Sequence, residues 1–148
     1  MALSRQKTPA VRKAASAENL CGKGAYQLAG SADAKVTIFA SGTEVGIAMG
    51  ARDQLEAAGV ATRVVSTPCW ELFEQQPPAY QAQVIGKSPV KIAVEAGVRE
   101  GWDRFIGHDG TFVGMKGFGA SAPYERLYAE FGITADAVAK LAKGLAGA

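Results

Sequence analysis

Short runs of apolar and β-branched residues alternate with longer helix-like segments along most of this chain. Repetition of strand and helix is typical of a mostly parallel sheet whose two faces are covered by helices. We therefore expect an α/β fold. The pattern predicts strands over 25–30, 35–42, 61–68, 90–97 and 111–115, helices over 43–59 and around 70–85, and two further helices towards the carboxyl end.

Length and composition limit this fold to one domain. A chain of 148 residues can bury one core and is too short for two ordinary domains. With 48% apolar residues, 20% charged residues and 18 glycines, it has the composition of a soluble α/β domain. The first 24 residues contain four basic residues before any acidic one and show neither strand nor helix periodicity. We interpret 1–24 as a linker and 25–148 as the domain.

Charge, aromatic content and cysteine spacing exclude several classes of function. A net charge of +2 with 8% aromatics argues against a nucleic-acid-binding surface. The sequence has no apolar run long enough to span a membrane, and its first twenty residues lack the apolar part of a signal peptide. Cys21 and Cys69 form no CxxC motif and have no histidine cluster beside them, so they indicate neither a metal site nor a disulfide framework. We expect a cytoplasmic protein.

Local signals mark where helices begin and end. Ser41 and Glu44 have the spacing of a capping box at the start of the helix expected over 43–59. Gly59 supplies a stop for that helix, and Thr134 can cap the final one.

The most suggestive motif is a glycine-rich segment near the carboxyl end. Gly117, Gly119 and Ala122 fit the G-x-G-x-x-G/A pattern of dinucleotide-binding folds. That pattern requires a following strand with an acidic residue about twenty positions further on, where this chain has the region of Lys140 within a predicted helix. We therefore interpret the segment as a tight strand-to-helix turn that needs the backbone freedom of glycine.

Three titratable residues are candidates without obvious partners. Asp109 lies in a Gly-Asp-Gly-like run that can contribute to a Mg²⁺ site, but the only asparagine, Asn19, is far upstream, which favours a turn residue. His108 is the single histidine, and no nucleophile can be identified beside it, which favours a surface or structural role. Glu95 follows a predicted parallel strand, at the edge where α/β folds place ligands.

Aromatic residues around the second helical region have structural interpretations. Trp70 and Phe73 are three positions apart, on one helical face, and fit a core or interface. Trp70 and Trp102 could instead form a surface that pairs with a second copy. Cys69 could be a redox thiol, although a structural role fits a thiol with no neighbouring cation.

Six segments of the sequence resemble, in their order and spacing, the C-terminal end of transketolase. The resemblance covers essentially the whole chain. The segments are LSRQ at 3–6, FASGTEV at 39–45, RVVSTPCWELFEQQ at 63–76, VEAG at 94–97, GWDRFIGHDG at 101–110 and GMKGFGASAPYERLYAEFGIT at 114–134.

The resemblance implies both a fold and a parent enzyme. The fold would be a three-layer α/β/α domain on a five-stranded sheet, mostly parallel, with 25–30 as the one antiparallel strand. The parent would be a homodimer that uses thiamine diphosphate and Mg²⁺ to transfer a two-carbon ketol unit between sugar phosphates in the pentose phosphate pathway. In the family the cofactor sites belong to the other transketolase domains, so we expect none in this chain and no activity from it alone. The domain itself would have a structural, dimer-supporting or regulatory role.

One substrate contact is implied for this chain. In the family, the arginine of the LSRQ motif helps to bind the sugar phosphate, and it matches Arg5. A guanidinium suits this role because it is permanently charged and presents a fork of donors. The alternative that the residues leave open is a free-standing nucleotide- or anion-binding α/β module.

Overall fold

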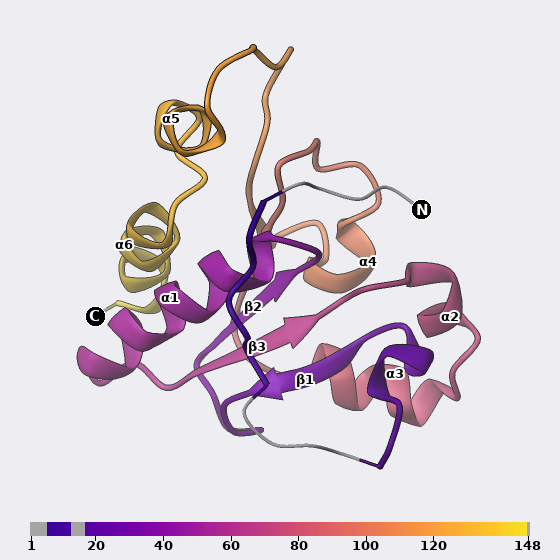
Figure 1. Ribbon diagram of the computed structural model, residues 1–148. Helices are drawn as coiled ribbons and strands as arrows, with labels where there is room; N and C mark the ends of the chain where they lie inside the picture. Colours follow the sequence, from indigo (N-terminus) through magenta and orange to yellow (C-terminus); the bar gives the residue numbers. More distant parts are fainter. Residues whose placement is uncertain (1–5, 13–16, 148) are drawn as a thin grey trace.

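The computed structural model describes residues 6–12 and 17–147, in which a mixed sheet lies between two layers of helices (Figure 1). The elements are η1 (Leu20–Lys23), β1 (Tyr26–Ala29), β2 (Val36–Ala40), α1 (Glu44–Ala57), β3 (Thr62–Ser66), α2 (Trp70–Glu74), α3 (Pro78–Ile85), β4 (Val90–Val94), α4 (Asp103–Ile106), β5 (Thr111–Val113), α5 (Tyr124–Glu130) and α6 (Ala135–Ala146).

The sheet has five strands in the order β1-β3-β2-β4-β5. The pairs β2–β3, β2–β4 and β4–β5 are parallel, while β1 runs antiparallel to β3. The mostly parallel sheet and its one antiparallel strand are therefore confirmed. All residues of β2 and β3 are buried, as expected for central strands covered on both faces.

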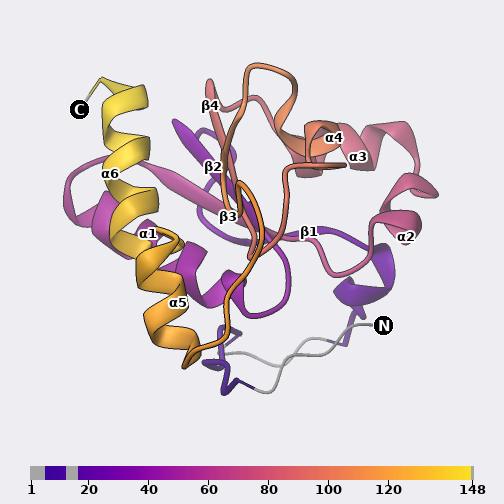
Figure 2. The ribbon, with the colours of Figure 1, turned by 90° about the horizontal axis from the view of Figure 1, so that it is seen from above.

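Helices cover the two faces with separate apolar clusters. One cluster joins α1 and α6 to residues of β2, β3 and β4, with part of α5 packed against it. The other joins α2, α3 and α4 to the opposite face of the sheet. Figure 2 shows α1, α5 and α6 on one side and α2, α3 and α4 on the other. In the described part of the chain, no helix is long and apolar enough to cross a membrane.

Two of the expected helix boundaries are confirmed and one is wrong. Gly59, with a φ of +76°, follows the end of α1, and the Thr134 side chain accepts a hydrogen bond from the Ala137 backbone N–H at the start of α6. The capping box at α1 does not form. Thr43 is the residue that precedes the helix, and no side chain caps the first turn.

The segment before β1 also contacts the domain. Val11 packs against the cluster that contains α1. Asn19 accepts a hydrogen bond from the Gly22 backbone N–H at 3.2 Å, which fixes the short turn η1.

Candidate functional site at the carboxyl edge of the sheet

The candidate site lies where the order of the strands reverses. The chain passes from β2 to β3 on one side of β2, whereas β4 lies on its other side. In open α/β sheets, ligands bind outside the carboxyl ends of the strands at such a reversal. Ser41 is the residue after β2 and Glu95 is the residue after β4. Glu95 thus has the strand-end position that the sequence predicted.

At this edge, Glu44 and Glu95 accept hydrogen bonds from hydroxyl groups of two segments, the turn after β2 and helix α5. The Ser41 Oγ donates to Glu95 Oε2 at 2.6 Å, and the Thr43 Oγ1 donates to Glu44 Oε1 at 3.0 Å. The Tyr128 hydroxyl, from α5, donates to the same oxygen of Glu44. These contacts explain why the capping box is absent, since the side chains of Ser41 and Glu44 are bound elsewhere.

Burial lets the carboxyl group of Glu95 hold a proton near neutral pH. Desolvation raises the pKa of Glu95 from its ordinary value of 4.5 to about 7. The hydrogen bond from Ser41 opposes this rise, while the charge of Glu44 and a hydrogen bond with Glu44 add to it. Burial and the hydrogen bond with Glu44 also raise the pKa of Tyr128 to about 12, so this hydroxyl stays a donor at neutral pH.

A cavity of about 390 Å³ adjoins the pair. Its wall includes Tyr128 from the hydrogen-bonded cluster and Gln6 from the segment before the domain. The Gln6 Oε1 is buried without a hydrogen-bond partner. Further lining residues come from the turn after β4 and from the segment between β5 and α5, among them Val98, Met115, Gly117 and Gly119.

The chemistry available at this edge is proton storage. A Ser–carboxylate contact alone lacks the imidazole that activates the hydroxyl in a hydrolase triad, and the single histidine lies elsewhere. Across residues 6–12 and 17–147, no group of three or more His, Cys, Asp or Glu side chains could hold a metal ion. The hydroxyl–carboxylate hydrogen bonds instead join the start of α1, the end of β4 and α5.

The glycine-rich segment beside the cavity differs from the tight turn that we expected. It forms the long connection from β5 to α5 and projects from the body of the domain (Figure 1). Neither Gly117 nor Gly119 has a positive φ, and a Cβ at either position would meet no atom within 4 Å. The prediction that Gly117 and Gly119 need the backbone freedom of glycine is therefore wrong. Only helices α5 and α6 follow in the described chain, so the nucleotide-binding alternative is not favoured.

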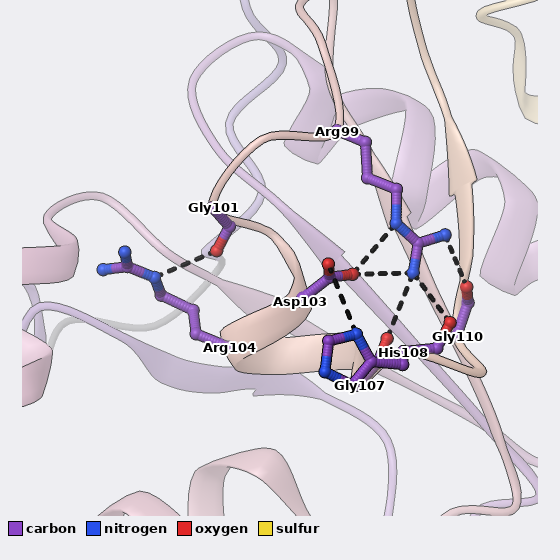
Figure 3. A network of polar contacts seen from close by, with 7 residues as sticks. All are labelled: Arg99, Gly101, Asp103, Arg104, Gly107, His108 and Gly110. Carbon is purple, nitrogen blue, oxygen red and sulfur yellow. Dashed lines mark hydrogen bonds and ion pairs between the residues drawn. The ribbon is translucent and has the colours of Figure 1, made fainter.

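Figure 3 shows the polar contacts around His108, in the turn before β5. Arg99 donates to Asp103 Oδ1 and to the backbone carbonyls of Gly107, His108 and Gly110, at distances between 2.6 and 3.1 Å. The guanidinium thereby fixes the turn. The His108 side chain is 97% exposed, with its Nδ1 3.9 Å from Asp103 Oδ2. Asp109 lies in the same turn, directly before β5, as the turn interpretation predicted.

Sequence reasoning missed Arg99 as the organiser of this turn. The signal was present, because Arg99 and Asp103 have the i, i+4 spacing of a helical ion pair, and α4 begins at Asp103. Its contacts with three backbone carbonyls had no signal in the sequence.

The aromatic residues belong mainly to the core. Trp102 is 1% exposed and Phe73 is 2% exposed, and both lie in the cluster that contains α2, α3 and α4. The half-buried Trp70 meets Trp102 edge-on at 5.0 Å between ring centroids, with the Arg104 guanidinium 4.9 Å above its ring. The hypothesis that both tryptophans form a surface for pairing with a second copy is therefore wrong, because Trp102 is buried in the core of its own chain. Cys69 is a half-buried free thiol that donates to Glu71 Oε2 at 3.4 Å.

The one residue expected to bind substrate, Arg5, lies outside the described residues. Gln6, the next residue, lines the cavity at the carboxyl edge.

Comparison with known proteins agrees with this architecture. Transketolase of Cereibacter sphaeroides is 49% identical over 143 residues, which cover 97% of this chain and 22% of that protein. Transketolase of Sinorhizobium medicae is 53% identical over 142 residues, which cover 93% of this chain and 20% of that protein. The solved structure of a transketolase from Leishmania mexicana matches this chain with a TM-score of 0.78 and 41% sequence identity. The match covers 86% of this chain and 18% of the Leishmania chain.

The chain therefore spans about a fifth of the length of these relatives. The family model for the transketolase-like TK C-terminal domain matches residues 24–134. This match includes the complete sheet and the carboxylate pair. The chain belongs to the transketolase C-terminal domain family.

Proposed function

We propose that this chain is the C-terminal domain of a transketolase that transfers a two-carbon ketol unit between sugar phosphates. The observation that carries the proposal is the family match over 24–134, together with relatives named transketolase that align with nearly the whole chain. The start of β1 at Tyr26 supports a boundary between a linker over 1–24 and a domain over 25–148. Two free cysteines are consistent with a reducing, cytoplasmic location.

The parent enzyme would use thiamine diphosphate and Mg²⁺, but the described residues do not fit that group. A diphosphate-bound Mg²⁺ needs several oxygen ligands. Asp109 stands alone on its turn, and the carboxyl-edge glutamates already accept from hydroxyl groups. We therefore propose that the other domains of the parent hold the cofactor.

The domain's own part in the parent would be to support neighbouring domains and the homodimer. Three large apolar side chains beside the carboxyl-edge cavity are exposed: Phe118 at 101%, Val98 at 56% and Tyr124 at 41%. Gln6 and Lys7 lie at the same surface, so the segment before the domain approaches it there. Exposed apolar groups around a cavity are typical of an interaction surface.

We expect the 148-residue chain alone to show no ketol transfer. A coupled assay with xylulose 5-phosphate, ribose 5-phosphate, thiamine diphosphate and Mg²⁺ tests this directly. The reaction should run at the rate of the blank, because the described residues offer no site for the cofactor that carries the ketol unit. A full-length transketolase in the same assay serves as the positive control. Turnover by the chain above the blank would contradict the prediction.

We also propose that Arg5 binds the substrate phosphate in the parent enzyme. Loss of a charge-assisted contact to phosphate costs about 1.5–3 kcal/mol, so Arg5→Gln in the parent should raise KM for xylulose 5-phosphate by roughly ten- to a hundredfold, with a smaller effect on kcat. Arg5→Lys should recover part of the loss. Arg12→Gln is the matched control, since Arg12 is an exposed arginine of the same segment. An unchanged KM in Arg5→Gln would exclude this role.

A further inference from the structure

A buried arginine lies at the edge of the sheet opposite the carboxylate pair. Arg63 is the second residue of β3, near the amino ends of the parallel strands, and only 1% of it is exposed. Its Nη2 donates to the Val84 carbonyl at 2.7 Å and to the Gln83 carbonyl at 3.4 Å, both near the end of α3. Within the described residues, Nε is buried without a partner, and no hydrogen bond is formed by Nη1.

This guanidinium has no counterion in the described part of the chain. None of the ion pairs formed there includes Arg63. Desolvation accordingly lowers the pKa of Arg63, with no acidic neighbour raising it. A buried charge is costly unless it is paired, and guanidinium donors are well suited to oxyanions. The two backbone carbonyls account for one of the three guanidinium nitrogens.

Arg63 forms part of the wall of a cavity of about 650 Å³. Lys35 and Lys87, both exposed, are the other cations around it, and Asp33 is the one acidic residue. Three cations and one carboxylate give the wall a formal charge of +2. We call this the amino-edge cavity. Its volume lies in the range of pockets that hold small organic ligands.

Gly86 lets the Arg63 guanidinium pack directly against the backbone at the end of α3. It ends α3 with a φ of +67°, a conformation that favours glycine. A Cβ built on it would lie 1.9 Å from Arg63 Nη1. Gly86 itself belongs to the cavity wall, so Nη1, which like Nε has no hydrogen-bond partner among the described residues, lies next to this wall.

We propose that the amino-edge cavity binds a phosphate group, held by Arg63 together with Lys35 and Lys87. A wall charge of +2 complements a phosphate dianion, and Nη1, the unpartnered guanidinium nitrogen beside the wall residue Gly86, suits its oxygens. The cavity has room for more than the phosphate, so a phosphorylated metabolite fits it. This site is separate from the carboxyl edge and does not depend on the proposed function of the parent.

The first test is an NMR titration of the 148-residue chain with inorganic phosphate, with ionic strength held constant by chloride. We expect saturable shifts of the backbone amides of Gly86 and Lys87 and of the Arg63 Nε–H. Shifts that stay linear with concentration, or that lie away from the cavity, would overturn the proposal. A second titration with ribose 5-phosphate identifies the source: tighter binding indicates an organic phosphate, and equal binding indicates recognition of the phosphate group alone.

Variants separate this site from general attraction to positive charge. Lys35→Ala combined with Lys87→Ala should weaken phosphate binding about tenfold or more, because the cavity loses two of its cations. Both lysines are exposed, so the double variant is expected to fold. Lys140→Ala, at an exposed lysine of α6, should leave the affinity unchanged. Unchanged affinity in the double lysine variant would refute the site.

Discussion

Replacement of Glu95 by glutamine is expected to stabilise the domain at neutral and alkaline pH. The folded pKa of Glu95 is about 7 against an ordinary value of 4.5. Between these values the folded state binds more protons than the unfolded state, so this group's contribution to stability falls as pH rises through the window. Above about pH 7 the folded protein holds an ionised, partly desolvated carboxylate. Glutamine does not ionise and removes that cost.

The glutamine also fits the existing contacts. Its amide oxygen can accept from Ser41, as Glu95 Oε2 does at 2.6 Å, and its NH₂ group can donate to Glu44. We expect Glu95→Gln to raise the free energy of unfolding by about 1–3 kcal/mol at pH 8, a range reduced for the partial exposure of the site. Near pH 5 the gain should be much smaller, since Glu95 is already protonated when folded. Urea denaturation at both pH values measures the difference.

The matched control for this variant is Glu130→Gln. Glu130 is an exposed residue at the end of α5. It should change stability by less than about 0.5 kcal/mol at either pH. If Glu95→Gln destabilised the domain equally at pH 5 and pH 8, the Glu95 carboxylate would be acting as a needed acceptor, and a protonated Glu95 near neutral pH would be excluded.

The sequence predicted the position of Glu95 but not its partners. Strand periodicity places a residue at the end of a strand, and the parallel order brings those ends to one edge. The pairing of Ser41 with Glu95 joins residues 54 positions apart, and that of Glu44 with Tyr128 joins residues 84 positions apart. No local pattern encodes such contacts. The capping-box spacing of Ser41 and Glu44 was a valid local signal that tertiary hydrogen bonds overrode.

For the glycine-rich segment, the sequence pattern predicted what the segment is not, but did not explain its glycines. Its spacing matched a phosphate loop, and its context correctly argued against one, because no strand follows in the described chain. Close packing within the domain does not explain why positions 117 and 119 are glycine, because a Cβ at either position would lie in open space. Their neighbour Phe118 is fully exposed. Contacts with other parts of a larger protein would account for such a segment, and these lie beyond what a single-domain sequence pattern can predict.

The largest loss of stability is expected from Trp102→Ala. The indole is 1% exposed and contacts the rings of Trp70, Phe105 and Phe112, with centroids 5.0 to 6.4 Å away. Truncation of a buried tryptophan leaves a cavity between α4 and the sheet and costs about 3–5 kcal/mol. Since a domain of this size is stable by roughly 5–15 kcal/mol, the loss would be a large share of the total. Urea unfolding followed by far-UV circular dichroism measures it independently of tryptophan fluorescence.

Phe118→Ala is the control for Trp102→Ala, because it also removes a large aromatic side chain but one that is exposed. Phe118 is 101% exposed, so its truncation removes almost no buried apolar area and should change the free energy of unfolding by less than about 0.5 kcal/mol. Trp70→Ala should fall between the two, because its ring is half-buried and packs on Trp102. Equal unfolding midpoints for Trp102→Ala and Phe118→Ala would contradict the placement of Trp102 in the core. They would instead favour the surface pairing of the two tryptophans that the sequence alone had left open.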